Sequence, residues 1–276
     1  MQVPKHTLAN GVEIPMIGFG TWKLKGQQCT DLVRYAIGNL HLCGSEVIVR
    51  VNSIETPMFL ADLAAVVPQK PDLIMLPKTC TAEDIQMLAQ TLDRLEAENG
   101  LSAGAVGILA LIETALGVEN AFSIASASPR VQALFLGAED LSADLHCKRT
   151  KEGAEIQYAR TRLVMAGGID VYDTPFTDVD DDEGLCADAA LAKSLGFTGK
   201  AAISPRHLGN INRCFSPTQA EVDHANEVLA ALEEGKRQGR GAVALHGKMI
   251  DAPIAARAKR TLADAEQILK RGGTLA

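Results

Sequence analysis

The chain has 276 residues, of which 47% are hydrophobic and 4% aromatic, and its formal net charge is −7. This length suits a single α/β barrel, and the absence of a Lys/Arg cluster argues against a nucleic-acid surface. No apolar run approaches 18 residues, so we expect no membrane span. The six cysteines have no zinc or C-x-x-C spacing, and no signal-peptide pattern is present, which predicts a cytoplasmic protein with reduced thiols.

The chain opens with a predicted hairpin centred on Asn10-Gly11, and strand-like runs then alternate with helical runs. Seven runs are expected to form parallel strands: Ile17–Trp22, Glu46–Val51, Asp72–Leu76, Val106–Ile112, Val131–Leu136, Ile169–Asp173 and Lys200–Ile203. Eight runs are expected to be helical: Gln27–Leu40, Met58–Val67, Thr81–Asn99, Ala115–Ala127, Ile156–Gly167, Leu185–Leu195, Glu221–Gln238 and Ala255–Arg271.

This alternation predicts a TIM-type parallel (β/α) barrel with a C-terminal helical lid. The first quarter is atypical because Leu40 and Glu46 leave no room between them for a further strand and helix. We therefore expect seven parallel strands plus the hairpin, rather than eight strands. Residues 1–45, 46–215 and 216–276 form three segments of one predicted structural domain.

Two acidic residues stand where buried strands end. The apolar run from Gly107 leads into Glu113, and the run from Val131 leads to Asp140. The carboxyl ends of barrel strands lie on the face that carries the site, so these carboxylates predict an oxygen-rich seat for a hard divalent cation such as Mg²⁺. The alternative is that Glu113 caps the next helix and Asp140 ends a strand in a turn.

Two other features lie at predicted strand ends. Arg50 is placed to bind a carboxylate through its guanidinium, or else to form a structural ion pair with Glu113 or Asp140. Gly137 and Ala138 form a predicted turn whose backbone N–H groups either hold a substrate carboxylate oxygen or belong to an ordinary turn.

Several short stretches share a resemblance to one family: Val49–Asn52, Leu76–Lys78, Leu111–Thr114, Gly137–Leu145, Gly196–Lys200 and Gly247–Asp251. In this order, over residues 46–272, the chain resembles the citrate lyase beta-subunit and malyl-CoA lyase family of CoA-ester lyases. The resemblance implies a Mg²⁺-dependent enzyme that cleaves or forms a C–C bond between an acyl-CoA and a 2-oxo acid. It leaves open whether the acid is glyoxylate, oxaloacetate or pyruvate.

The same resemblance implies residue roles. Glu113 and Asp140 become the Mg²⁺ ligands, and Arg50 binds the oxo acid. Asp251 lies in the segment that forms a lid over a neighbouring subunit's site, where it acts as acid or base on the thioester partner. The alternative for Asp251 is an exposed loop acid. The shared site implies a homotrimer or homohexamer.

Residues 4–40 resemble a different family. The stretch from Lys5 to Trp22 is similar to the opening of an aldo-keto reductase, and the Gln27–Leu40 helix matches that family's first helix. The chain therefore has the appearance of a chimera, which favours two further hypotheses. One is a barrel scaffold whose catalysis is impaired. The other, an NADPH-dependent reductase, is disfavoured because that family's downstream catalytic residues are missing.

Overall fold

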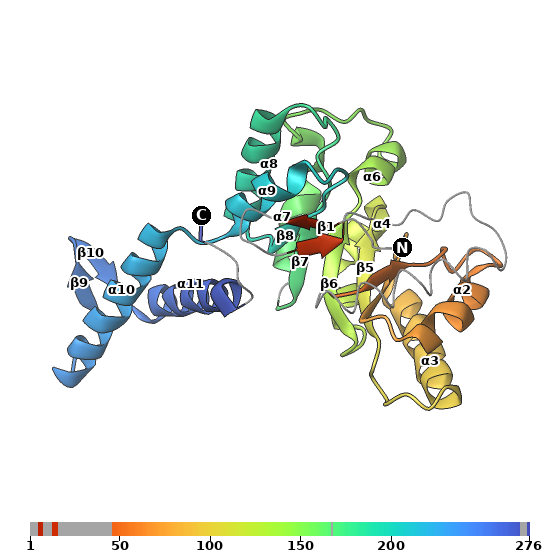
Figure 1. Cartoon of the computed structure of the whole chain (residues 1–276), viewed down its shortest axis with the longest axis horizontal. Helices are drawn as coiled ribbons and strands as arrows, with labels where there is room; N and C mark the ends of the chain where they lie inside the picture. Colours follow the sequence, from red (N-terminus) through yellow and green to blue (C-terminus); the bar gives the residue numbers. More distant parts are fainter. Residues whose placement is uncertain (1–4, 8–12, 16–45, 167, 271–274) are drawn as a thin grey trace. The chain divides into compact units, whose positions relative to one another are not determined.

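The structure is a computed structural model that describes residues 5–7, 13–15, 46–166, 168–270 and 275–276. The chain divides into two compact units, and within the described residues the first ends at His207 and the second continues from Leu208 (Figure 1). Each unit is considered by itself. The three predicted segments, which divide the chain at other positions, stay a prediction.

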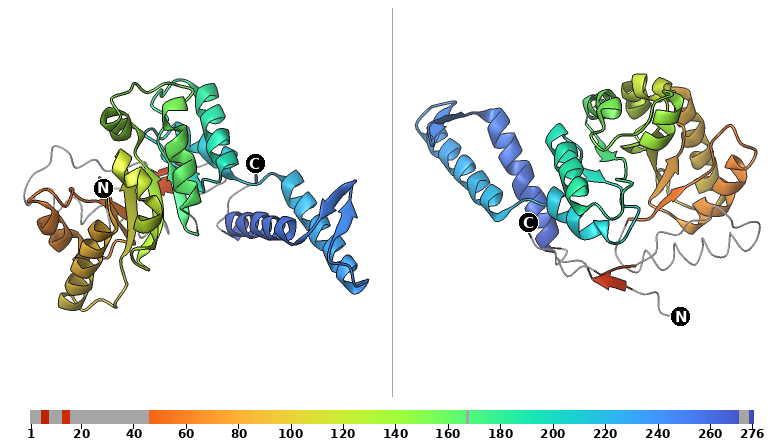
Figure 2. Two further views of the ribbon diagram at one scale, coloured as in Figure 1. Left: turned by 180° about the vertical axis from the view of Figure 1, so that it is seen from behind. Right: turned by 90° about the horizontal axis from the view of Figure 1, so that it is seen from above.

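The first unit is built on a parallel sheet of six strands, which pair with one another in chain order. The strands are β3 (Ile48–Arg50), β4 (Leu73–Leu76), β5 (Gly107–Ile112), β6 (Val131–Leu136), β7 (Asp170–Asp173) and β8 (Gly199–Lys200). The sheet curls into half of a barrel (Figure 2). Strands β3 to β7 lie within five of the predicted strands, whereas β8 overlaps the predicted strand Lys200–Ile203 only at Lys200.

Helices connect the strands and cover the sheet. They are α2 (Phe59–Val66), α3 (Ala82–Glu98), α4 (Ala115–Glu119), α5 (Ala121–Ser126), α6 (Ala138–Asp144), α7 (Gln157–Met165) and α8 (Asp182–Leu195), with short 3-10 turns η1 (Val67–Gln69) and η2 (Ala154–Ile156). The predicted helix Ala115–Ala127 is interrupted at Asn120, which separates α4 from α5. Helix α6 was not predicted.

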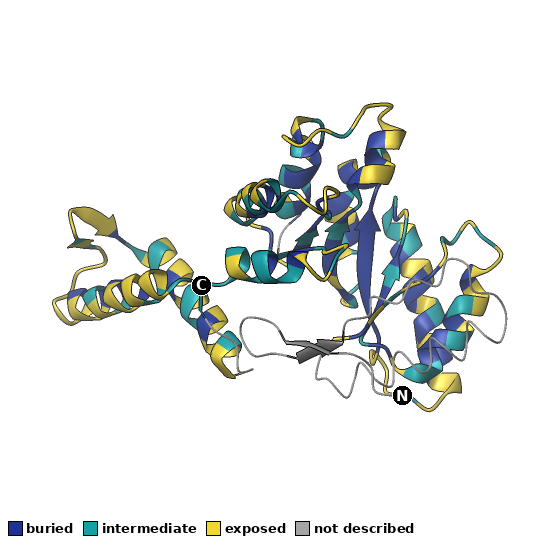
Figure 3. Ribbon diagram, turned by 45° about the horizontal axis from the view of Figure 1, so that its top comes forward, coloured by how far each residue is buried: buried dark blue, intermediate teal, exposed yellow. Residues whose placement is uncertain are grey.

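Burial explains why the strands can be recognised in the sequence. Every residue of β5 is buried, as a strand covered on both faces requires, and the central strands form the most buried part of the unit (Figure 3). Helix α3 buries Ile85, Leu88 and Leu92 on one face and begins with a capping box formed by Thr81 and Asp84.

The N-terminal part of the prediction lies largely outside the described residues. Strands β1 (Lys5–Thr7) and β2 (Glu13–Pro15) pair in a two-stranded sheet, as the predicted hairpin requires, but Asn10-Gly11 and the predicted strand Ile17–Trp22 are not described. The count of seven strands and the closure of the barrel therefore stay predictions. No helix in the described part of the chain is long and apolar enough to cross a membrane.

The C-terminal unit is a pair of long helices joined by a small hairpin. It contains α9 (His207–Phe215), α10 (Gln219–Arg237), β9 (Val243–Leu245), β10 (Lys248–Ile250) and α11 (Ala252–Lys270). Its core is formed by buried residues of α10, β10 and α11, among them Val228, Leu232 and Ile250. The hairpin lies within the segment that the sequence assigns to a lid.

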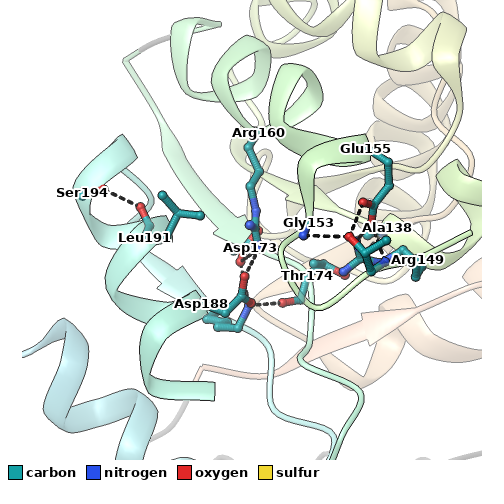
Figure 4. A network of polar contacts seen from close by, with 12 residues as sticks. Ala138, Arg149, Gly153, Glu155, Arg160, Asp173, Thr174, Asp188, Leu191 and Ser194 are labelled. Carbon is teal, nitrogen blue, oxygen red and sulfur yellow. Dashed lines mark hydrogen bonds and ion pairs between the residues drawn. The ribbon is translucent and has the colours of Figure 1, made fainter. Parts of the chain in front are cut away.

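A fully buried ionic cluster ties the last strands of the sheet to two helices. Each of the two cations contacts both of the two carboxylates, and we call the four residues the charge quartet: Arg160 (α7), Asp173 (β7), Asp188 (α8) and Lys200 (β8). The contact distances lie between 2.5 and 2.8 Å (Figure 4). The two positive and two negative charges balance, which lets the quartet remain ionised away from water.

Removing one cation from the quartet should destabilise the first unit. We expect Lys200→Met to lower the free energy of unfolding by about 3–5 kcal/mol, because Asp173 and Asp188 would keep two buried negative charges against Arg160 alone. Urea unfolding followed by circular dichroism measures this change. The matched variant Lys148→Met alters an exposed lysine and should stay within about 0.5 kcal/mol of wild type. Equal stabilities for the two variants would contradict the stabilising role of the charge quartet.

Candidate functional site

The candidate site begins with Glu113, which directly follows the last residue of β5. Its side chain is only 5% exposed, and its Oε1 accepts a hydrogen bond of 2.9 Å from the backbone N–H of Lys78. Lys78 follows β4 and has a positive φ of 52°, a conformation that turns the chain at the strand end. Its own side chain is exposed, so Lys78 contributes to the site through its backbone.

Asp140 approaches Glu113 from the next βα connection. It lies in the first turn of α6, the helix that follows β6, and its side chain is exposed. Burial and then the negative charge of Asp140 raise the pKa of Glu113 to about 7, against the opposing effects of the Lys78 N–H group and the Arg50 charge. The structure thus brings the two predicted carboxylates together at the carboxyl edge of the sheet.

Gly137 makes this approach possible. A Cβ atom at this position would lie 2.7 Å from the Glu113 Cβ and 2.8 Å from its Oε2, closer than real Cβ contacts allow. The requirement is steric, because the residue between β6 and α6 must leave room for the buried carboxylate of the neighbouring strand. The sequence analysis did not identify this role for Gly137. In the sequence, this role is indicated by a glycine that follows one apolar run, the run from Val131, when the preceding apolar run, from Gly107, ends in Glu113.

The two backbone N–H groups that were predicted to bind a substrate carboxylate already have acceptors. Gly137 N–H donates to the Ile112 carbonyl at 2.9 Å, and Ala138 N–H donates to Thr174 Oγ1 at 3.3 Å. Neither donor is free in this structure, so the predicted contact would require one of these bonds to break or to be shared. The Gly137 N–H extends the hydrogen bonding between β5 and β6, and the Ala138 N–H is the donor that is capped in the first turn of α6.

Arg50 is the last residue of β3 and is exposed at the same edge of the sheet. Its positive charge is close enough to lower the pKa of Glu113, although burial and Asp140 have larger opposite effects. In the described part of the chain, Arg50 forms no ion pair with Glu113 or Asp140.

Asp251 belongs to the C-terminal unit, where it directly follows β10. Its Oδ1 accepts a hydrogen bond of 3.4 Å from the Ile254 N–H at the start of α11. Asp251 is thus placed like a helix cap, and its assignment as an acid or base on the thioester partner stays a prediction.

The donor set fits a hard divalent cation. Ionised Glu113 would be a buried carboxylate facing a second carboxylate, and a bound cation would balance both charges. Among the described residues, no group of three or more His, Cys, Asp and Glu side chains is arranged to hold a metal. A pair of carboxylates suits Mg²⁺, which usually keeps several water ligands and uses one or two carboxylates.

The raised pKa of Glu113 has a measurable consequence in metal-free protein. Because this pKa is about 7 in the folded state, above the ordinary value of 4.5, protonation of Glu113 favours the folded state, and this contribution is lost as the pH rises through 7. Glu113→Gln removes the titration. We expect the variant to gain stability relative to wild type between pH 5 and pH 8 in chelator-treated protein. If the difference in unfolding free energy between Glu113→Gln and wild type stays constant from pH 5 to pH 8, the raised pKa of Glu113 is contradicted.

Comparison with known proteins places this site in a family. A family model described as HpcH/HpaI aldolase/citrate lyase matches residues 29–205. The citrate lyase subunit beta of Leuconostoc mesenteroides subsp. cremoris is 38% identical over 88% of this chain and 82% of its own length. The L-malyl-CoA/beta-methylmalyl-CoA lyase of Rhodobacter capsulatus is 33% identical over 74% of this chain and 71% of its own length.

A solved structure agrees with these relatives. It is the crystal structure of CitE from Mycobacterium tuberculosis in complex with magnesium, acetoacetate and coenzyme A. This neighbour is 28% identical, with a TM-score of 0.68, and the match covers 88% of this chain and 86% of that one. The resemblance of residues 4–40 to an aldo-keto reductase is untested and stays a prediction. The chain belongs to the HpcH/HpaI aldolase/citrate lyase family, as the lyase resemblance of residues 46–272 predicted.

Proposed function

We propose that this protein is a Mg²⁺-dependent CoA-ester lyase that cleaves or forms a C–C bond between an acyl-CoA and a 2-oxo acid. The observation that carries the proposal is the buried Glu113 carboxylate facing Asp140 at the carboxyl edge of the sheet. The names of the relatives support it, since they include lyases of citrate and of malyl-CoA esters. The magnesium, acetoacetate and coenzyme A bound to the structural neighbour support it as well.

Glu113 and Asp140 are the proposed protein ligands of the cation. When bound, Mg²⁺ acts as a Lewis acid that polarises the oxo and carboxylate oxygens of the acid fragment. Glu113 is held for this role by the Lys78 N–H group, which fixes one carboxylate oxygen, while Gly137 leaves room for the other. Asp140 enters from α6 and completes the pair.

Arg50 is the proposed anchor of the 2-oxo acid. Its guanidinium lies at the edge that carries the two carboxylates, is exposed, and is free of an ion pair with either of them within the described residues. A guanidinium holds a carboxylate through two parallel hydrogen bonds, which also fixes the orientation of the acid. We do not assign this contact to the N–H groups of Gly137 and Ala138, because both already have acceptors.

The proposed cleavage balances in protons and electrons. The hydroxyl proton of the 3-hydroxyacyl-CoA goes to a base, the C2–C3 bond breaks, and its electron pair stays on C2 next to the thioester. A proton from an acid then completes the acyl-CoA, while C3 becomes the carbonyl carbon of the 2-oxo acid. We propose Asp251, from the C-terminal segment of a neighbouring subunit in a homotrimer or homohexamer, as the residue that exchanges this C2 proton.

Metal binding by the two carboxylates can be tested by titration calorimetry. Glu113→Gln and Asp140→Asn should each weaken Mg²⁺ binding at least about tenfold, because each removes a charged ligand. The matched control, Glu98→Gln, changes an exposed carboxylate on α3 that pairs with Arg94 and should leave the affinity unchanged. Equal affinities in all four proteins would place the cation elsewhere.

The reaction itself can be assayed in the direction of condensation. We expect acetyl-CoA or propionyl-CoA to condense with glyoxylate, oxaloacetate or pyruvate only when Mg²⁺ is present. The acid that condenses with the highest kcat/KM identifies the 2-oxo acid substrate. Arg50→Ala should raise the KM for the oxo acid. A wild-type protein that binds Mg²⁺ but condenses none of these pairs would support the alternative of a non-catalytic scaffold.

The shared site makes a separate prediction. Asp251→Ala subunits should be inactive in condensation, and Arg50→Ala subunits should be nearly so at an oxo-acid concentration well below their raised KM. Mixing the two should restore partial activity at that concentration, because some mixed interfaces contain one intact site. Sedimentation measures assembly in parallel. A strictly monomeric protein, or mixed oligomers no more active than the two parents, would remove the shared-site assignment.

A further inference from the structure

We propose that Thr174 is a positioning residue for the metal site, because it caps the helix that carries Asp140 and is itself fixed by the charge quartet. This inference rests on the proposed function for its metal and deepens it. It adds a residue that directly follows β7, a strand that provides neither of the two proposed metal ligands.

Helix α6 has no cap of its own. Gly137, at its N-cap position, has no side chain that could accept a hydrogen bond from the first turn. Thr174 Oγ1 fills this need from the neighbouring strand connection, since it accepts the Ala138 N–H at 3.3 Å (Figure 4). The Thr174 side chain is 1% exposed, so water does not compete for the bond. The start of α6 is therefore defined by the position of Thr174.

Thr174 has little freedom to move. Its backbone carbonyl accepts a hydrogen bond of 2.7 Å from Lys200 Nζ. The residue before it, Asp173, uses both carboxylate oxygens on Arg160 and one of them also on Lys200, at 2.6–3.0 Å (Figure 4). The backbone carbonyl of Asp173 accepts the Ala201 N–H at 3.0 Å. These contacts fix the chain at Asp173 and Thr174 to helix α7 and to β8 with the residue that follows it.

Glu113 and Asp140 are positioned in different ways. Glu113 is buried and has its own hydrogen bond from Lys78. Asp140 is exposed, and its position depends on the short helix that carries it. The far end of α6 is held by Asp144, whose Oδ2 accepts the Ala115 N–H at 2.8 Å. The near end, two residues before Asp140, is held by Thr174. Loss of the Thr174 bond should therefore displace Asp140 while leaving Glu113 in place.

The first measurement uses metal-free protein, so it does not depend on the proposed activity. Thr174→Val keeps the side-chain shape but removes the acceptor, and it should speed hydrogen–deuterium exchange in the peptide spanning residues 138–145. Thr174→Ser restores the hydroxyl and should restore protection. Thr198→Val is the matched control, because Thr198 Oγ1 likewise accepts a backbone N–H, from Val171 at 3.1 Å at the other end of β7. It should leave exchange in 138–145 unchanged.

The second measurement is Mg²⁺ affinity by titration calorimetry with the metal alone. Thr174→Val should weaken binding about tenfold, in the range found when partners that orient metal ligands are removed, while Thr174→Ser and Thr198→Val stay within about twofold of wild type. A merely structural role would lower the melting temperature of both Val variants without separating their affinities.

The outcomes distinguish this inference from the function on which it rests. If wild-type protein binds no Mg²⁺, the proposed function fails, and the exchange experiment still decides whether Thr174 fixes α6. If wild type binds Mg²⁺ but Thr174→Val matches it in both affinity and exchange, the positioning role is overturned. The positioning role would also be overturned if Thr174→Ser failed to restore wild-type exchange in residues 138–145 or wild-type Mg²⁺ affinity.

Discussion

The approach of two carboxylates at the carboxyl edge of the sheet is the constraint around which the site is arranged. Burial alone disfavours ionised Glu113, and the neighbouring charge of Asp140 disfavours it further, which raises the pKa of Glu113 to about 7. The surroundings accommodate this arrangement. Gly137 removes a side chain that would clash, and the Lys78 N–H group stabilises one oxygen. Such a pair is unfavourable in an empty site, and the cation proposed to bind there would balance its charges.

The charge quartet shows the opposite use of buried charge. Its two cations and two carboxylates neutralise one another, and each cation contacts both acids, although Arg160 Nη1 is buried without a hydrogen-bond partner among the described residues. The quartet joins β7 and β8 to α7 and α8, and through Thr174 it reaches the first turn of α6. The charge quartet is therefore balanced in charge and joins the last two strands to their helices, while the pair of Glu113 and Asp140 is left short of positive charge.

The sequence predicts the centre of the sheet well because β5 is buried on both faces and the strands beside it are largely buried. The continuous apolar runs that become β5 and β6 end near Glu113 and Asp140, and the parallel arrangement brings these residues to one edge. Other features depend on partners that are distant in sequence. Helix α6 is short and is capped from β7, and the quartet combines residues of four elements. The roles of the Lys78 N–H and of Gly137 depend on backbone geometry and space, which residue type alone does not reveal.

The central claim is that Glu113 and Asp140 hold a cation that contacts the 2-oxo acid directly. Electron paramagnetic resonance of Mn²⁺-loaded protein, with ¹⁷O-labelled glyoxylate or pyruvate, tests this contact without requiring turnover. The account predicts that the label broadens the Mn²⁺ signal of wild type and of Asp251→Ala, and that Asp140→Asn loses the bound signal. Bound Mn²⁺ whose spectrum is indifferent to labelled acid, in protein shown to bind that acid, would contradict the account.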